Sequence, residues 1–234
     1  MQNRIVSRDE WLVARKQHLV KEKEYTRLRD QLSQSRRELP WVKVEKEYLF
    51  DGPNGKQTLS ALFENRSQLM IYHFMFGPDW EEGCPSCSYI SDQFDGIGIH
   101  LNHRDITLTV VSKARFDKLE AYRKRMGWQF KWMSSFESDF NDDYQVSFSP
   151  DQKEDERYYN YVAKGFPAEE APGISVFYKN EQGDLFHTYS SYGRGLDMLI
   201  GAYHFMDLVP KGRDEDGKNM AWLRRHDQYD DPQG

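Results

Sequence analysis

Two apolar runs of strand length, separated by one helical stripe, are the feature that most constrains the fold. Residues 68–76, QLMIYHFMF, and residues 106–112, ITLTVVS, are continuous and apolar, as expected of central strands covered on both faces. Between them apolar residues recur at intervals of four, three and four, which predicts a helix: Ile90, Phe94, Ile97 and Leu101. Two strands joined in this way favour parallel pairing with a right-handed crossover.

The same alternation of strand and helix continues along the chain. Residues 114–127 have the pattern of an amphipathic helix, and residues 128–135 that of a short strand. The segment 173–190, GISVFYKNEQGDLFHTYS, predicts an antiparallel hairpin, and residues 194–208 predict a final helix. We therefore expect an α/β protein with a mixed central sheet.

The remaining segments define the expected domain boundaries. From Ser7 to Leu39 the sequence is charged, and its apolar residues recur at loose helical spacing. Ser7 followed by Glu10 fits a capping box, so one long helix or two short ones, ended by Pro40, are expected. The next segment, WVKVEKEYLFDGPNGKQTLSALF, predicts a hairpin running into a short helix. We expect a helical extension at 1–40, a main domain at 41–210 and a polar tail at 211–234.

Composition excludes some classes of partner. The 234 residues carry a formal net charge of −6, with both signs mixed along most of the chain, so no broad basic face suggests nucleic acid binding. No apolar stretch approaches the ~20 residues that span a bilayer, so no membrane partner is expected. The N-terminus lacks the pattern of a secretory signal, which favours a cytoplasmic protein.

The only two cysteines lie in DWEEGCPSCSYI, between the predicted strand at 68–76 and the helix that follows it. In a reducing cytosol such a pair is more often catalytic, redox-sensing or metal-binding than a permanent disulfide. At a helix start, unpaired backbone N–H groups stabilise a thiolate at Cys84, and Pro85 fits the first turn. Cys87, one turn further in, is placed to attack a mixed disulfide, so both cysteines are candidate catalytic residues.

Two other interpretations of the cysteines stay open. Cys84, Cys87, His100 and His103 superficially resemble a zinc finger, but a straight helix separates His100 from Cys87 by ~20 Å, too far for a shared ion. Alternatively, the cysteines are inert and small core residues. We expect neither a metal nor a cofactor.

Two more segments hold tentative substrate-binding residues. Pro172, in EEAPGISVFY, begins a predicted strand at a position where a cis peptide bond can set a tight turn, although a trans loop proline is equally compatible. Arg194, between two glycines before a predicted helix, suggests an anion site made of backbone N–H groups and guanidinium; an exposed arginine in a flexible junction is the alternative.

Together these residues resemble the thioredoxin superfamily: a strand, W-x3-C-x-x-C, a helix, β-α-β, then a proline before a hairpin and a final helix. The hairpin EYLFDGPNGKQTLSALF is similar to that of peroxiredoxin-like members. RDEWLVARKQHLVKEKEYTRLRDQL, MIYHFMFGPDWEEGCPSCSY and SSYGRGLDMLIGAYHFMDLVPKGRDE resemble an uncharacterised bacterial thioredoxin-like family labelled predicted dithiol-disulfide oxidoreductase.

The resemblance implies a three-layer α/β/α sandwich with a long N-terminal helix and an inserted loop or lid at about 137–171. It also implies that Cys84 attacks, Cys87 resolves, Trp80 flanks the site and Pro172 is the candidate cis-proline.

The chain departs from both family patterns. Glu81, Glu82 and Gly83 intervene where thioredoxin has Trp directly before the first Cys, and the carboxylates are expected to raise the pKa of Cys84. Pro78 is one residue too close to Cys84, and Glu82 replaces the hydroxyl residue, for the peroxiredoxin pattern. Peroxidase chemistry is therefore not the leading hypothesis.

The leading hypothesis is a thiol-disulfide oxidoreductase whose partner is a disulfide-containing protein or a small thiol compound. The alternative is a non-catalytic or redox-sensing binding module that uses the aromatic residues of the insertion: Phe140, Tyr144, Phe148, Tyr158, Tyr159 and Tyr161. A long N-terminal helix is a common dimerisation element, but such a helix can equally pack against its own domain. The sequence therefore does not decide whether the protein forms a homodimer.

Overall fold

The computed structural model describes residues 3–163 and 165–229, and the chain divides into two compact units at Pro40. The last five residues of the predicted tail lie outside the described residues. The first unit contains one helix, α1 (Arg8–Arg37), with no buried side chain among those described. The predicted capping box is confirmed: the Glu10 N–H donates to the Ser7 hydroxyl, and the Ser7 N–H donates to the Glu10 carboxylate at 3.0 Å.

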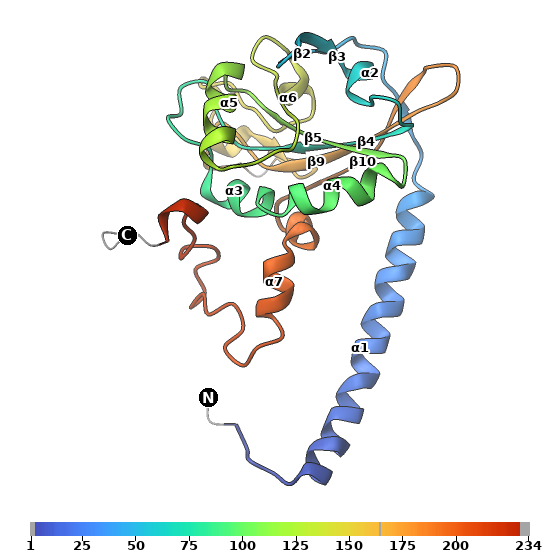
Figure 1. Ribbon diagram of the computed structural model, residues 1–234, viewed down its shortest axis with the longest axis vertical. Helices are drawn as coiled ribbons and strands as arrows, with labels where there is room; N and C mark the ends of the chain where they lie inside the picture. Colours follow the sequence, from blue (N-terminus) through green and yellow to red (C-terminus); the bar gives the residue numbers. More distant parts are fainter. Residues whose placement is uncertain (1–2, 164, 230–234) are drawn as a thin grey trace. The chain divides into compact units, whose positions relative to one another are not determined.

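The second unit is built on an eight-stranded mixed sheet (Figure 1). The strand order is β1-β10-β9-β4-β5-β6-β2-β3. The strands are β1 (Val42–Lys43), β2 (Leu49–Gly52), β3 (Gly55–Thr58), β4 (Gln68–His73), β5 (Ile106–Ser112), β6 (Trp132–Ser134), β9 (Gly173–Lys179) and β10 (Leu185–Tyr192). As predicted, β4, β5 and β6 are parallel and β9–β10 is an antiparallel hairpin. β9 also pairs antiparallel with β4, which makes the sheet mixed.

Helices cover both faces of this sheet. Tyr72 and Phe74 pack on one face with residues of α3 (Pro85–Ser91), α4 (Phe94–Asn102), α5 (Phe116–Arg125) and α7 (Gly201–Met206). Leu69 and Ile71 pack on the other face with α2 (Leu59–Leu62) and α6 (Phe140–Asp143). Figure 1 shows α3 and α4 on the side of the sheet opposite to α2 and α6. The protein is therefore an α/β/α sandwich of the thioredoxin-like class, as predicted.

The helix predicted after the cysteines is interrupted. α3 ends at Ser91 and α4 begins at Phe94. The Asp92 carboxylate accepts hydrogen bonds from the Trp128 indole at 2.8 Å and from the His226 ring at 2.6 Å, which fixes the break. Gly96 and Gly98 lie inside α4, with open space around them.

Two other predicted elements are also divided. The alternating segment WVKVEKEYLF contributes β1, which pairs with β10 at one edge of the sheet, and β2, which pairs with β3 and β6 towards the other edge. The final helix is a 3₁₀ helix, Gly193–Leu199, followed by α7. The backbone of Ile200 separates them, with φ −100° and ψ 81°.

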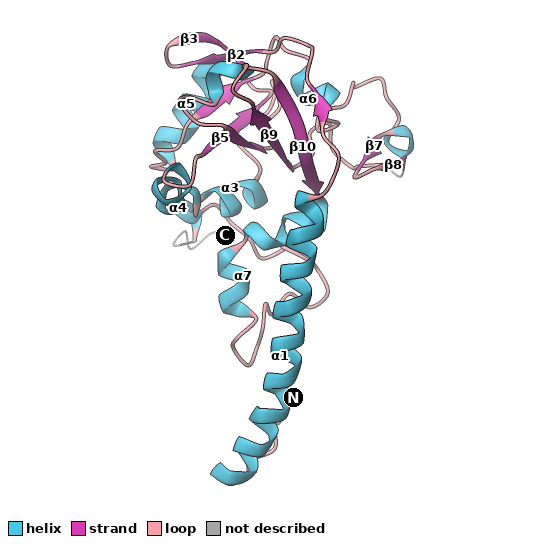
Figure 2. Ribbon diagram, turned by 90° about the vertical axis from the view of Figure 1, so that its right-hand side faces the viewer, coloured by secondary structure: helices cyan, strands magenta, loops and turns pink. Residues whose placement is uncertain are grey.

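Residues 137–171 form short ordered elements. Besides α6 they contain a 3₁₀ turn, Glu154–Glu156, and a small hairpin of β7 (Tyr158–Tyr159) and β8 (Val162–Ala163). Figure 2 shows this hairpin to one side of the main sheet, near α6. A separate small core supports it, made of Val146, Phe148, Tyr159, Ala171 and Tyr192.

No helix within the described ranges combines the length and the apolar character that crossing a bilayer requires.

Candidate functional site

The two cysteines occupy the start of α3, directly after the central strand β4. Cys84 is the N-cap residue, Pro85 is the first helical residue and Cys87 lies in the first turn. Cys84 is partly exposed, whereas Cys87 is 1% exposed, and both are free thiols. The sequence therefore located the pair correctly at a helix start, and the structure adds that the two thiols differ in exposure.

The surroundings of Cys84 favour its charged form. The Cys87 thiol donates a hydrogen bond to it and lowers the pKa of Cys84 to about 7, although burial acts in the opposite direction. The backbone N–H groups of Cys87 and Ser86 also lower this pKa, as does the positive charge of Arg225. A large fraction of Cys84 is therefore thiolate at neutral pH, which is the reactive form of a cysteine.

Cys87 has the opposite tendency. Burial raises the pKa of Cys87 well above its ordinary value, and the charge on Cys84 adds to this effect. The hydroxyl of the fully buried Tyr72 and the Met75 N–H both act to lower the pKa of Cys87. The Met75 nitrogen lies 3.4 Å from the Cys87 sulfur. At neutral pH the inner thiol keeps its proton, whereas a large fraction of the outer thiol is ionised.

The C-terminal segment supplies the cation near Cys84. The Nη2 and Nε atoms of Arg225 donate hydrogen bonds to the Gly83 carbonyl oxygen at 2.8 and 3.3 Å. Nε also donates to the Tyr122 hydroxyl at 2.9 Å, and Nη1 lies 2.8 Å from the Glu82 carboxylate. Arg225 thus links the loop before Cys84 to α5 and to the tail.

Glu82 is also neutralised by a second arginine. Its carboxylate pairs with Arg125, whose Nε atom donates to Asp227 of the tail at 2.7 Å. The expectation that the neighbouring carboxylates raise the pKa of Cys84 is therefore wrong: this pKa is lowered, chiefly by the hydrogen bond from Cys87. Glu82 is paired with two guanidinium groups, and Glu81 is exposed.

Trp80 lies in the loop between β4 and α3 and packs against the core that contains both cysteines. Lys118 fixes this loop by donating to the Trp80 carbonyl oxygen at 2.8 Å. The Trp80 side chain lines a cleft of 440 Å³ with residues of the insertion: Glu154, Arg157, Pro167, Ala168 and Glu169. The structure thus places Trp80 between the dithiol core and the insertion.

Pro172 directly precedes β9, at the level where β4 ends. Because the described residues contain no cis peptide bond, the cis arrangement considered for Pro172 is not present. Instead, the Tyr159 hydroxyl donates to the Pro172 carbonyl oxygen at 2.7 Å and accepts from the Gly193 N–H at 2.8 Å. Burial raises the pKa of Tyr159, and the hydrogen bond from the Gly193 N–H acts against this shift.

Arg194 does not form the anion site that the sequence suggested. Its side chain is 73% exposed, and its Nη2 atom lies 2.9 Å from the Asp197 carboxylate. The Gly193 N–H that would have faced an anion is bound to Tyr159. The guanidinium and the backbone donor therefore each have a partner within the protein.

The two histidines of the alternative zinc site lie at the C-terminal end of α4, where both are exposed. Within residues 3–163 and 165–229, no three His, Cys, Asp or Glu side chains are grouped so that they could hold a metal ion.

Sequence reasoning missed Arg225, Tyr122 and Tyr72. The position of Tyr72 could have been predicted, since side chains alternate along β4 and this places Tyr72 on the same face of the sheet as Phe74. Arg225 had no signal, because it is one of 32 basic residues and its contact with Gly83 spans 142 positions.

No curated protein sequence matches the chain. Similar solved structures include peroxidoxin BcpB from Mycobacterium tuberculosis (9% identity, TM-score 0.47, covering 70% of this chain and 94% of that one). Others are a putative thiol-disulfide oxidoreductase from Bacteroides vulgatus (14%, 0.38, 67% and 92%) and a putative thiol:disulfide interchange protein DsbE from Chlorobium tepidum (12%, 0.40, 70% and 97%). The family described as "Bacterial protein of unknown function (DUF899)" matches residues 1–229, and the chain therefore belongs to that family.

Proposed function

We propose that the protein is a thiol-disulfide oxidoreductase that exchanges its dithiol with the disulfide of a protein or a small molecule. The observation that carries this proposal is the pairing of a partly exposed Cys84, stabilised as thiolate, with a buried and protonated Cys87 one helical turn away. For two inert core cysteines we would expect both pKa values to be raised, because burial alone raises the pKa of a thiol.

The reaction has two exchange steps. The Cys84 thiolate attacks one sulfur of the substrate disulfide, and the other substrate sulfur leaves as a thiolate and takes a proton from water. Cys87 then loses its proton and attacks the Cys84 sulfur, which forms the Cys84–Cys87 disulfide and releases the second substrate thiol. An external dithiol must reduce this disulfide before the next turnover.

The surroundings of each sulfur fit these steps. In the first, the N–H groups of Ser86 and Cys87 and the charge of Arg225 hold the attacking thiolate. In the second, the Tyr72 hydroxyl and the Met75 N–H favour the Cys87 thiolate as it forms. Trp80 is the proposed apolar contact for substrate, because it extends from the dithiol core to the cleft beside the insertion.

Trapping the mixed disulfide tests this function. Cys87→Ser cannot complete the second step, so it should accumulate an adduct with glutathione disulfide or insulin, detected by mass spectrometry, while Cys84→Ser forms none. The wild type should also speed insulin reduction by dithiothreitol relative to Cys84→Ser. The proposal fails if no adduct forms and Cys84 alkylates at pH 7 no faster than an ordinary thiol.

A further inference from the structure

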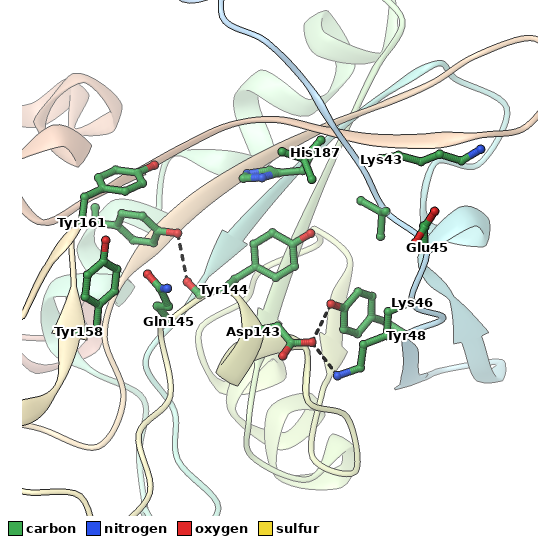
Figure 3. A pocket seen from close by; sticks show the side chains of 13 residues that line it. Lys43, Glu45, Lys46, Tyr48, Asp143, Tyr144, Gln145, Tyr158, Tyr161 and His187 are labelled. Carbon is green, nitrogen blue, oxygen red and sulfur yellow. Dashed lines mark hydrogen bonds and ion pairs between the residues drawn. The ribbon is translucent and has the colours of Figure 1, made fainter.

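A tyrosine-rich pocket of 410 Å³ lies on the sheet face opposite the dithiol (Figure 3). Side chains alternate along β4, so Tyr72 faces the dithiol core while the His73 ring stacks on Tyr144 of the pocket, with 6.0 Å between centroids. Residues of β1, β10, the end of α6 and the β7–β8 hairpin line it. Its aromatic lining consists of Tyr48, Tyr144, Tyr158, Tyr161, Tyr192 and His187.

The pocket has no free positive charge among its described residues. Lys43 lies 2.8 Å from the Asp184 carboxylate, and Lys46 lies 2.7 Å from that of Asp143. Burial lowers the pKa of His187, which keeps its ring neutral at pH 7. Among the described lining residues, Glu45 is the carboxylate without a hydrogen bond or an ion pair, and its charge acts on the neighbouring Lys43. An anion would find no unpaired partner here, whereas a cation would find Glu45.

The uncommitted acceptors lie at two ends of the pocket. Figure 3 shows Glu45 at one end and Tyr158 with Gln145 at the other, with Tyr144 and His187 between them. In the described structure, the Gln145 carboxamide and the Tyr158 hydroxyl have no hydrogen-bond partner within the protein. A ligand with one hydrogen-bonding group at each end of a chain matches this arrangement.

The backbone is strained where it presents two of these side chains. Gln145 has φ 58°, and Asn160 and Tyr161, the turn between β7 and β8, have φ 53° and 65°. Such a turn favours glycine at its second position, and a bulky residue there costs about 1–2 kcal/mol. The Tyr161 hydroxyl donates to the Ser190 carbonyl oxygen at 2.9 Å, so its ring is fixed in the pocket wall. Two strained backbone positions therefore present Gln145 and Tyr161 in the pocket wall.

We propose that this pocket binds a linear organic diamine or polyamine. One ammonium group pairs with the Glu45 carboxylate. The other lies at the tyrosine end, where ring faces attract cations and the Gln145 and Tyr158 oxygens accept hydrogen bonds. The chain between them packs against Tyr144.

Titration calorimetry with two ligands of equal length tests the proposal. 1,8-Diaminooctane should bind the full-length protein at least about tenfold more tightly than 1,8-octanediol, and added salt should weaken the binding. Glu45→Gln and Tyr158→Leu should each weaken diamine binding about fivefold or more, and Tyr158→Phe should weaken it less, since it keeps the ring face. Glu47→Gln, an exposed carboxylate outside the lining, is the matched control and should leave affinity unchanged.

Equal affinity for diamine and diol, no binding of either at millimolar concentration, or unchanged affinity in Glu45→Gln would each overturn the proposal. Circular dichroism verifies that the variants are folded. Cys84→Ser should bind the diamine like the wild type, because the pocket lies on the opposite face of the sheet, so the outcome is independent of the proposed redox function.

Discussion

Arg225 donates a hydrogen bond of 2.8 Å to the carbonyl oxygen of Gly83, the residue that precedes Cys84. The next tail residue, His226, contacts Asp92 just beyond the other end of α3 at 2.6 Å. Two adjacent tail residues therefore hold the dithiol helix at both of its ends. The position of α3 and the charge state of Cys84 therefore depend on the segment that the sequence predicted only as a polar tail.

Replacing Arg225 tests this dependence. Arg225→Ala removes a positive charge that lowers the pKa of Cys84, so this pKa should rise from about 7 and the alkylation rate at pH 7 should fall about twofold to threefold. Iodoacetamide alkylation measured from pH 5 to 10 reports Cys84, because Cys87 is buried and protonated.

Arg224→Ala is the matched control, since among the described residues its guanidinium bonds only to the carbonyl oxygen of Leu223. This variant should keep the wild-type alkylation profile, and Arg225→Lys should fall between wild type and alanine. An unchanged profile in Arg225→Ala would show that the tail does not influence the thiol.

Gly83 is expected to tolerate no side chain. A Cβ atom there would lie 2.7 Å from a ring carbon of Phe74 and 3.0 Å from one of Tyr122, both in the core. Gly83→Ala should lower the free energy of unfolding by about 1–3 kcal/mol in urea titrations. The added Cβ of Gly96→Ala in α4 meets open space, so this variant should instead raise the free energy of unfolding by up to ~1 kcal/mol. If both variants changed the free energy of unfolding equally, the steric clash at Gly83 would be contradicted.

Tyr72 is expected to assist the second exchange step. Its hydroxyl lowers the pKa of Cys87, so Tyr72→Phe should raise that pKa further and lengthen the lifetime of the mixed disulfide about twofold to tenfold. Stopped-flow mixing with glutathione disulfide, followed by acid quench and mass spectrometry, measures this lifetime. Tyr89→Phe removes another buried hydroxyl, which lies on α3, and should leave the lifetime unchanged.

The sequence predicted the elements whose signals are local. The apolar runs of β4 and β5, the capping box of α1 and the start of α3 at the cysteines all match the structure, because burial and end-capping depend on nearby residues.

Interactions between distant residues decided the rest. The break after α3 depends on Asp92, whose partners Trp128 and His226 lie 36 and 134 positions away. The effect of Glu82 on Cys84 was wrongly inferred, because Arg125 and Arg225 offset the charge of the Glu82 carboxylate. Periodicity reports which face is buried, and it contains no information on which side chains meet there.

The carboxyl group of Glu170 is buried beside Ser147, with its oxygens 2.8 and 2.9 Å from the serine hydroxyl. Burial raises the pKa of Glu170 to about 8, although the Ser147 hydrogen bond opposes this. The unfolded carboxyl ionises near the ordinary value of 4.5. Between these two pH values the native state binds more protons than the unfolded state, so stability falls as pH rises through this window.

In Glu170→Gln the carboxamide does not ionise, so the stability of this variant should not fall with pH for this reason. Between pH 5 and pH 8 the wild type should lose roughly 3 kcal/mol more of its free energy of unfolding than the variant. Urea unfolding at pH 5, 6, 7 and 8 measures the difference, and the exposed Glu169→Gln should follow the wild type. If the curves of wild type and Glu170→Gln run parallel, Glu170 is ionised in the native state at neutral pH and the small core of the insertion contains a buried charge.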